Sequence, residues 1–357
     1  MIFSIWLTAV AIQVVIAILL TLQFFRPSKK RNDTTRSFSI IIAAHNELEN
    51  LKILIPGLIG QAHSDFEIIV VLDRSTDKSE AFLEGLNCDK LKIVSIEKTA
   101  PGYDSKKYAL SRAIEVAENE WLVFTDADCH PSSDRWLHQI ESMADERTSI
   151  ILGYSPYRNH GRFIHYFIQF EGFLTAFNYL SMARLGKPYM GVGRNMAVRR
   201  TFFHESGGYN SFKSITGGDD DLFIQTNATS KNTEIVMGKG ALVHSYPKNS
   251  IKDYLKQKMR HLSVGGSYSF SDQFFHFVFN TTNLLTWLLI PFLSLQIVLP
   301  IILFYLSVKV IGYRFAAGKM GAGFNYILLP LVDLIYAVFI PIIAIRSKLV
   351  KDIRWKN

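Results

Sequence analysis

The chain of 357 residues has only two cysteines, Cys88 and Cys129, and no CxxC pair. Two cysteines cannot provide the disulfide framework of a small secreted domain, and a thiolate zinc site is not expected. The glycine-rich stretch at 191–200 lacks the spacing and the Lys-Ser/Thr pair of a phosphate-binding Walker loop. Charged residues make up 20% of the chain, and hydrophobic residues 48%. The cysteine usage predicts a reducing, intracellular environment, and the high share of hydrophobic residues predicts that part of the chain is strongly apolar.

Charge is missing altogether from residues 2–25. This segment exceeds the roughly 20 apolar residues that a membrane helix needs. It lacks the basic start and small-residue cleavage site of a signal peptide. Basic residues follow at once at 26–31, and basic flanks stay preferentially in the cytoplasm. We therefore predict an N-terminal membrane anchor over 1–26, with the chain continuing on the cytoplasmic side.

A second apolar region is predicted over residues 274–345. Its first part, 274–313, is nearly uncharged and is interrupted by Pro291 and Pro300. It is too long for one membrane helix and just long enough for two closely spaced ones.

The last apolar segment, 324–345, contains Asp333. An intramembrane carboxylate can serve function, although a structural role is at least as reasonable. If the basic linker at 314–319 and the basic cytoplasmic tail at 346–357 face the same side, this segment is re-entrant or interfacial. If it crosses, the charge rule is broken. Two or three C-terminal transmembrane helices are therefore expected.

Residues 36–245 have the pattern of an α/β domain. Continuous apolar, β-branched runs are typical of strands buried on both faces, and they alternate with segments of helical periodicity. Asn46 is expected to cap the first helix. The alternation predicts right-handed crossovers and a mostly parallel, Rossmann-like sheet. The predicted strands are 38–44, 66–72, 91–96 and 121–125, and the predicted helices are 47–60, 79–86 and 106–117.

Acidic side chains follow two of the predicted strands. Asp73 follows the second strand, whereas Asp126 and Asp128 follow the fourth. Ligands of such sheets bind beyond the carboxyl ends of the strands, so these side chains are expected at one edge. Two neighbouring carboxylates repel one another unless a cation or donors lie between them, and their oxygens suit Mg²⁺ or Mn²⁺. Taken alone, the Asp-x-Asp pattern is explained more simply by turn chemistry.

Seven motifs together resemble family 2 glycosyltransferases of the GT-A fold, in order and in approximate spacing, over residues 38–261. The flanking apolar segments resemble those of membrane-embedded members that make polysaccharides or glycolipids. Three motifs depart from the family pattern: AAHNE replaces P-x-x-N-E, SKK replaces G-K, and the Q-x-x-R-W box ends in His261. The last departure weakens the expectation of repeated, polymer-forming transfer. The motifs are FSIIIAAHNELENL, FEIIVVLDRSTDKS, SKKYALSRAIE, WLVFTDADC, GVGRNMAVRR, GGDDDLFIQ and QKMRH.

The resemblance implies roles for the donor side of the site. Asp73 is expected to contact the nucleotide base, with Glu47 beside it. Lys106 is expected near the nucleotide, although an exposed lysine at a helix start explains it equally well. Asp126 is expected to face the ribose or the donor sugar. Asp128 is expected to bind a divalent cation, Mg²⁺ or Mn²⁺, that bridges the diphosphate.

Inverting transfer also needs a base that takes the proton of the acceptor hydroxyl. The resemblance makes Asp219 the base, with Asp220 a close second. Glycine before this cluster lets backbone and substrate approach closely. Asp221 is expected to cap or orient the helix that follows, because acids stabilise helix N-termini.

The acceptor side is expected in two places. By the resemblance, the glycine-rich loop with Arg194 and Asn195 lies on the acceptor side or contacts the donor sugar, with Arg194 assigned to nucleotide-sugar binding; an exposed β-turn is an equally good explanation. Residues 246–272 form a basic amphipathic region, which predicts a helix on the membrane surface. Within it, the resemblance implies that Gln257 and Arg260 frame the acceptor and the diphosphate.

Together these features predict a membrane-bound inverting glycosyltransferase. It would move a sugar from a nucleotide-diphosphate donor, with a UDP-sugar favoured, to a lipid or membrane-associated glycan. The alternatives are a polyprenyl-phosphate sugar synthase and a catalytically inactive membrane scaffold. The net charge of +8 gathers beside apolar segments, which favours membrane lipids over nucleic acid as a partner. The expected location is the inner membrane, with the catalytic domain cytoplasmic.

Overall fold

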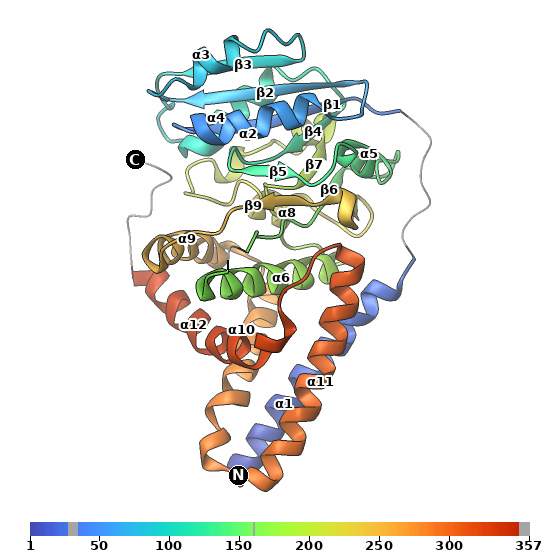
Figure 1. The fold of residues 1–357 in the computed structure, drawn as a ribbon, viewed down its shortest axis with the longest axis vertical. Coiled ribbons are helices and arrows are strands. Elements are labelled where there is room, and N and C mark those ends of the chain that lie inside the picture. The colour runs from blue at the N-terminus through green and yellow to red at the C-terminus, as the bar shows by residue number, and fades with distance from the viewer. Residues whose placement is uncertain (28–34, 160, 350–357) are drawn as a thin grey trace.

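The computed structural model describes residues 1–27, 35–159 and 161–349. An α/β domain lies above a stalk of helices, and the N-terminus lies at the far end of the stalk (Figure 1). Parts of the predicted basic flank and basic tail, residues 28–31 and 350–357, lie outside the described ranges.

The α/β domain is built on a sheet whose described strands run in the order β3-β2-β1-β4-β7-β6-β8. The first four strands of this order are parallel, and β6 is parallel to β8. Strand β7 runs antiparallel to both β4 and β6. The mostly parallel sheet is therefore confirmed. The strands are β1 (Phe38–Ala44), β2 (Phe66–Asp73), β3 (Leu91–Ile96), β4 (Trp121–Phe124), β6 (Ile150–Leu152), β7 (Met196–Arg199) and β8 (Thr233–Ile235), with β5 (Cys129–Pro131) and β9 (Val243–Ser245) paired separately.

Helices cover both faces of the sheet. Alternate residues of a strand point to opposite faces. In β1, Ile40 and Ile42 accordingly pack with α2 and α5, whereas Ile41 and Ala43 pack with α4 and α6. This double cover explains why β1, β2 and β4 are buried along their whole length. The helices of the domain are α2 (Leu48–Ile59), α3 (Ser79–Glu84), α4 (Ser105–Glu115), α5 (Trp136–Glu141), α6 (Phe163–Arg184), α7 (Arg200–Glu205) and α8 (Asp221–Asn227).

The predicted N-cap of the first helix is wrong. Glu47, not Asn46, is the cap residue of α2. Asn46 adopts a left-handed φ of 54°, and its Oδ1 accepts hydrogen bonds from the backbone N–H groups of Thr76 at 2.8 Å and Asp77 at 3.2 Å. Asp77 in turn accepts from the N–H of Leu48, the first residue of α2, at 3.0 Å. The loops after β1 and β2 therefore stabilise each other across the sheet edge.

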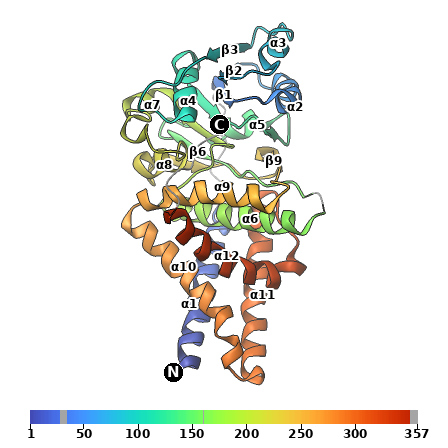
Figure 2. The same cartoon turned by 90° about the vertical axis from the view of Figure 1, so that its left-hand side faces the viewer.

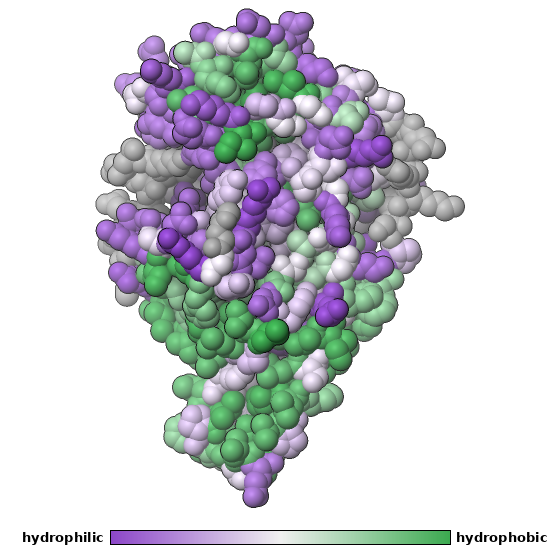
Figure 3. Space-filling view, viewed as in Figure 1, coloured by the Kyte–Doolittle hydropathy of each residue, from purple (hydrophilic) through white to green (hydrophobic). Residues whose placement is uncertain are grey.

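Three long helices form the stalk (Figures 1 and 2). Hydrogen bonds join α1 to α10: Trp6 Nε1 donates to the carbonyl of Thr286 at 2.9 Å, and Gln13 Nε2 to that of Phe279 at 2.7 Å. Hydrophobic residues cover most of the surface of the stalk and of the base of the domain (Figure 3). The stalk helices are α1 (Ile2–Leu22), α10 (Phe270–Leu288) and α11 (Leu295–Met320).

Three described helical segments are long and apolar enough to cross a membrane, namely 2–25, 295–320 and 326–347. The last includes most of α12 (Leu329–Leu349), which lies obliquely beneath the α/β domain rather than along the stalk (Figures 1 and 2). The more polar α10 runs along the stalk instead. The arrangement is thus two C-terminal stalk helices and one oblique helix. The basic residues 314–319 belong to α11, so the predicted linker there is wrong.

A buried ion pair fixes the start of α12. Lys309 Nζ on α11 lies 2.9 Å from Asp333 Oδ1, and neither residue is more than 1% exposed. Asp333 also accepts hydrogen bonds from Tyr305 at 2.8 Å and from Trp287 at 3.0 Å. A charge in apolar surroundings must be paired and hydrogen-bonded. Asp333 therefore has a structural role, joining α12 to α10 and α11.

Candidate active site

A cavity of about 850 Å³ lies between the α/β domain and the helices beneath it. Its upper end is formed by the sheet edge and by the loop that begins at Gly217. Its lower end is formed by α10, α12 and α9 (Ile251–Val264). The predicted site residues that line it are Lys106, Asp126, Arg194, Asp219, Asp220, Gln257 and Arg260.

Lys106 joins two acidic loops at the upper end. Its Nζ lies 3.1 Å from Asp126 Oδ1 and 2.9 Å from Asp219 Oδ2. Burial opposes the positive charge, but the carboxylates raise the pKa of Lys106 well above its usual value. Burial likewise opposes ionisation of Asp219, yet Lys106 lowers the pKa of that carboxyl. Lys106 is therefore not an exposed lysine but the cation that holds the two acids together.

The loop before Asp219 requires glycine. Gly217 and Gly218 have φ values of 77° and 73°, in the left-handed region. A Cβ on Gly218 would also lie 2.8 Å from Leu222. The loop is held from below by the buried Lys107, which donates to the carbonyls of Ile215 and Gly217. The sequence analysis missed Lys107, although its place directly after Lys106 on α4 points it to another side of that helix.

Asp219 and Asp220 differ in what holds them. Both oxygens of Asp220 accept backbone N–H groups, Oδ1 from Asp221 at 2.8 Å and Oδ2 from Gly193 at 2.6 Å. Burial and the nearby charge of Asp219 raise the pKa of Asp220. Within the described chain, the side-chain partner of Asp219 is Lys106. Asp220 therefore has the features of a structural acid, whereas Asp219 is held by an exchangeable ion pair.

Asp220, not Asp221, is the N-cap of α8, whereas Asp221 lies in the first turn of this helix, where an acid is favourable. Asp221 also accepts a hydrogen bond from Tyr268 Oη at 2.8 Å. Burial and the charge of Asp220 raise the pKa of Asp221 well above its usual value. Asp221 thus connects the acidic loop to the segment between α9 and α10.

A compact group of ligand atoms follows β4. Oxygens of Asp126 and Asp128 and the sulfur of Cys129 all lie within 4.8 Å of one another. Burial and the charge of Asp128 raise the pKa of Cys129 well above its usual value, so this side chain stays a neutral thiol. A neutral thiol is a poor ligand for a hard cation, whereas carboxylate oxygens suit Mg²⁺ and Mn²⁺. The two carboxylates fit such an ion.

The two candidate residues of the glycine-rich loop, Arg194 and Asn195, lie in different environments. Arg194 lines the cavity, and its guanidinium lies 4.5 Å from the ring centre of Tyr157. Asn195 is 1% exposed and donates to the carbonyls of Tyr154 and Ala241, both at 2.8 Å. Its Oδ1 accepts from Trp136 Nε1 at 3.1 Å. The expectation of an active-site Asn195 is therefore wrong; it fixes the loop that carries Arg194.

Asp73 and Glu47 lie at the same sheet edge but do not line this cavity. Asp73 ends β2, is fully buried and accepts two hydrogen bonds from Arg74, each 2.9 Å long. Glu47 begins α2 and accepts from Asn50. Because β1 lies between β2 and β4, Asp73 is separated from the Asp126 loop by about 10 Å, or two strand spacings. This spread suits an extended ligand such as a nucleotide.

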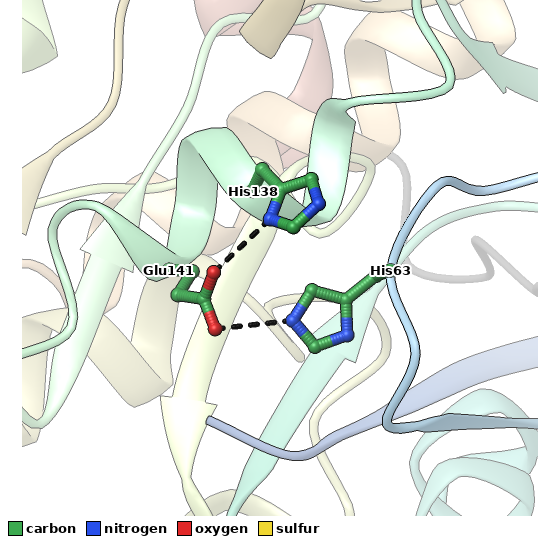
Figure 4. A group of neighbouring side chains, drawn as sticks. All are labelled: His63, His138 and Glu141. Atoms are coloured by element: carbon green, nitrogen blue, oxygen red, sulfur yellow. Dashed lines mark hydrogen bonds and ion pairs between the residues drawn. The ribbon is translucent and has the colours of Figure 1, made fainter. Parts of the chain in front are cut away.

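A second cluster of potential metal ligands, His63, His138 and Glu141, lies at the amino ends of the strands (Figure 4). The backbone N–H of Asp65 donates to His63 Nδ1, so the proton of this ring is on Nε2, which lies 3.1 Å from Glu141. The nitrogens of His138 face Glu141 and the carbonyl of Ala62, each at 3.1 Å. These hydrogen bonds make the cluster a clamp between α5 and the loop before β2.

The α/β domain is similar to known glycosyltransferases. Residues 39–207 match the family model of glycosyl transferase family 2. A mannosyltransferase from Pyrobaculum calidifontis, solved with GDP-Man and Mn²⁺, has the same fold, with a TM-score of 0.61 at 14% identity over 98% of each chain. The α/β domain is accordingly similar to glycosyl transferase family 2 over residues 39–207 and has the GT-A fold.

Curated relatives match a shorter part of the chain. The beta-monoglucosyldiacylglycerol synthase of Nostoc sp. is 27% identical over 135 residues, which are 36% of this chain and 28% of that protein. The 4,4'-diaponeurosporenoate glycosyltransferase of Staphylococcus haemolyticus is 28% identical over 130 residues, 36% of this chain and 34% of that protein. The match thus spans about a third of the length of these relatives.

Proposed function

We propose that the protein is a membrane-bound inverting glycosyltransferase. It transfers a sugar from a nucleoside-diphosphate sugar to a hydroxyl of a lipid or membrane-associated glycan. The observation that carries this proposal is the Asp126–Lys106–Asp219 ion-paired group at the head of a cavity that continues among apolar helices.

Asp219 acts as the base. The acceptor oxygen forms a bond to the anomeric carbon while its proton passes to the Asp219 carboxylate. The bond from that carbon to the diphosphate breaks, its electron pair leaves with the nucleoside diphosphate, and the configuration inverts. Lys106 exchanges its contact with Asp219 for the donor diphosphate, which frees the carboxylate to take the proton. Asp220 holds the loop through its two backbone hydrogen bonds.

Asp128, together with Asp126, would hold Mg²⁺ or Mn²⁺. The two carboxylates supply the hard oxygen ligands that such ions prefer. When bound, the ion neutralises the negative charge that develops on the departing diphosphate. The mannosyltransferase of the same fold was solved with Mn²⁺, which supports this assignment.

The remaining residues position the two substrates. Asp73 binds the base of the nucleotide, with Glu47 beside it, and we favour a UDP-sugar as donor. Arg194 and Arg260 add positive charge near the diphosphate, since both line the cavity with Lys106. Gln257, one turn before Arg260 on α9, contacts the acceptor.

The proposed location is the inner membrane, with the α/β domain in the cytoplasm. Support comes from the basic residues directly after the N-terminal apolar segment. Lys252 and Lys256 are exposed on α9, and apolar surface lies beneath this helix. This combination also fits contact with anionic lipid headgroups.

The proposal is tested with the purified full chain in nanodiscs made from bacterial lipid extract. The discs are incubated with radiolabelled UDP- and GDP-sugars, with Mn²⁺, Mg²⁺ or a chelator, and lipid and polymer products are separated by chromatography. We expect label transfer from one donor, loss with chelator and recovery with either ion. Asp128→Asn should raise the ion concentration needed, whereas Asp89→Asn, an exposed acid away from the site, should behave as the unmodified protein.

The product distinguishes the alternatives. A sugar linked through a phosphate is released by mild acid and would indicate a polyprenyl-phosphate sugar synthase. Absence of transfer and of donor hydrolysis with every donor would indicate a scaffold. Because His261 stands where the resembled box has tryptophan, we expect a short, lipid-soluble product rather than a polymer.

A further inference from the structure

The lower end of the cavity has a different character from its upper end. Apolar side chains line it from two helices, Phe277 and Leu284 on α10 and Ile340 and Ile345 on α12. Polar side chains of α10, such as Asn280, lie among them. The cavity thus passes from the acidic loop of the α/β domain into the layer of apolar helices.

This end of the cavity is also open to its apolar surroundings. Phe270, Phe274 and Phe277 line the cavity and are 84%, 57% and 66% exposed. On α12, Ile345 lines it and is 65% exposed. Side chains that both line a cavity and lie on the surface mark its rim, and here the rim belongs to the apolar part of the molecule (Figure 3). Large exposed apolar surface of this kind is typical of membrane contact.

We propose that the lower cavity binds the hydrocarbon chain of the acceptor lipid, which enters sideways between α10 and α12 and presents a headgroup hydroxyl to Asp219. This inference rests on the proposed transferase function and specifies its acceptor. The volume of the whole cavity, about 850 Å³ including its upper end, lies within the range of about 300–1,000 Å³ that is usual for ligand pockets.

The links between α8 and α10 fix the distance from lipid to base. Tyr268, just before α10, donates to Asp221 at the start of α8. Farther along α8, Gln225 donates to Asp272 in the first turn of α10 at 2.8 Å. The helix that begins beside Asp219 is therefore joined at two points to the helix that lines the lipid cavity. A lipid seated against α10 has its headgroup held at a constant position relative to the base.

The apolar lining favours a lipid over a glycan as the occupant. A sugar chain carries hydroxyl groups throughout, and those beside Leu284, Ile340 and Ile345 would lose their water hydrogen bonds without replacement. A hydrocarbon chain loses only unfavourable contact with water.

The test fills the cavity and measures two reactions. Ala344→Trp on α12 and Thr281→Trp on α10 place a large side chain inside, while Ile342→Trp is the matched control on the outer face of α12, 55% exposed. Each variant is assayed in nanodiscs for sugar transfer to lipid and for release of the nucleoside diphosphate by water. We expect the two filled variants to lose lipid transfer at least about tenfold, equivalent to about 1.4 kcal/mol. Their release of nucleoside diphosphate and the activity of Ile342→Trp should be unchanged.

Photocrosslinking gives a second measurement that does not depend on turnover. The unmodified protein is placed in nanodiscs of phosphatidylglycerol whose acyl chain carries a diazirine at mid-length. We expect crosslinks on the inward residues Thr281, Leu284 and Ile340, and their loss in Ala344→Trp. Crosslinks confined to outward positions such as Val338 and Ile342 would overturn the proposal.

The outcomes separate this inference from the proposed function. If the filled variants transfer sugar to lipid as well as the unmodified protein, the cavity is not the lipid site, although the protein is a transferase. If a water-soluble oligosaccharide is the better acceptor and filling blocks its use, the occupant is a glycan. If neither the variants nor the unmodified protein release nucleoside diphosphate from any donor, the proposed function itself is wrong.

Discussion

The α/β domain and the stalk both bury a lysine against aspartate, but the two arrangements differ in what surrounds them. Lys106 lies between Asp126 and Asp219 on the wall of a cavity, where a ligand can replace either contact. Lys309 and Asp333 are closed off by Tyr305 and other side chains of packed helices. The same charge pair thus serves an exchangeable site in one region and a fixed joint in the other. Access, rather than residue type, distinguishes them.

The largest effect is expected at the exchangeable pair. Asp219→Asn removes the proposed base while keeping the size of the side chain, and general-base catalysis contributes about 10²–10⁴-fold. We therefore expect kcat to fall by that range with the nucleotide still bound, as measured by transfer of labelled sugar and by titration with the nucleoside diphosphate.

The comparison variant is Asp220→Asn. It disturbs two backbone hydrogen bonds of the loop, so we expect loss of thermal stability with part of the activity retained. Full activity in Asp219→Asn together with none in a folded Asp220→Asn would assign the base to Asp220.

A large effect on stability is expected at the fixed joint. Removing one partner of a buried pair leaves an uncompensated charge and costs about 3–5 kcal/mol. Lys309→Met should accordingly lower the unfolding temperature of the detergent-solubilised protein and expose α12 to protease. The double variant Lys309→Met/Asp333→Leu should recover most of this loss, since replacing both partners by apolar groups is often neutral. No recovery in the double variant would show that the pair does more than join helices.

The pH dependence of transfer sharpens the distinction between the two acids. Lys106 lowers the pKa of Asp219 against the effect of burial, whereas burial and Asp219 raise that of Asp220. With Asp219 as base, kcat/KM should stay level as the pH falls from 7 until below the ordinary aspartate range near 3.9. Loss of activity already above that range would indicate Asp220. The ion pair of Asp219 stabilises the fold above the unfolded-state pKa, and this contribution is lost as the pH falls through the lowered folded-state value.

The smallest effect is expected at the clamp formed by His63, His138 and Glu141 (Figure 4), none of which lines the cavity. His138→Ala removes one partner of Glu141 and a hydrogen bond to Ala62. We expect about 2 kcal/mol of lost stability in denaturant unfolding, since each of the two hydrogen bonds contributes about 1 kcal/mol. Transfer per folded molecule should not change. Bound zinc that disappears in His138→Ala, detected by elemental analysis, would contradict the clamp.

Local patterns predicted what depends on neighbouring residues in the chain. The strands at 38–44 and 91–96 are confirmed to the residue. The apolar run of the first is buried on both faces, and the second pairs in parallel with the buried strand β2. Asp126 lies beyond the carboxyl end of β4, as the parallel topology predicts, and Lys106 joins it to Asp219, which the resemblance had suggested. Whether Asp219 is the base stays a prediction.

Contacts between distant segments decided the rest. Asn46 stabilises a loop 30 residues away instead of capping its own helix. Lys107 holds a loop more than 100 residues along the chain, which nothing in its neighbourhood signals. The oblique course of α12 depends on Lys309, a residue of another helix. The choice between two and three C-terminal membrane helices therefore could not be made from hydrophobicity alone.

The joint between Lys309 and Asp333 also has a consequence for how the protein is made. In the proposed membrane-bound protein, α11 would enter the bilayer before α12 has been synthesised, and Lys309 would lack its counter-ion Asp333 during that interval. A lone lysine or aspartate at the centre of an inserting helix costs about 2.5–3.5 kcal/mol. The unpaired Lys309 should therefore destabilise the nascent chain until α12, which carries Asp333, has been synthesised. We accordingly expect chains truncated before α12 to be degraded by membrane proteases.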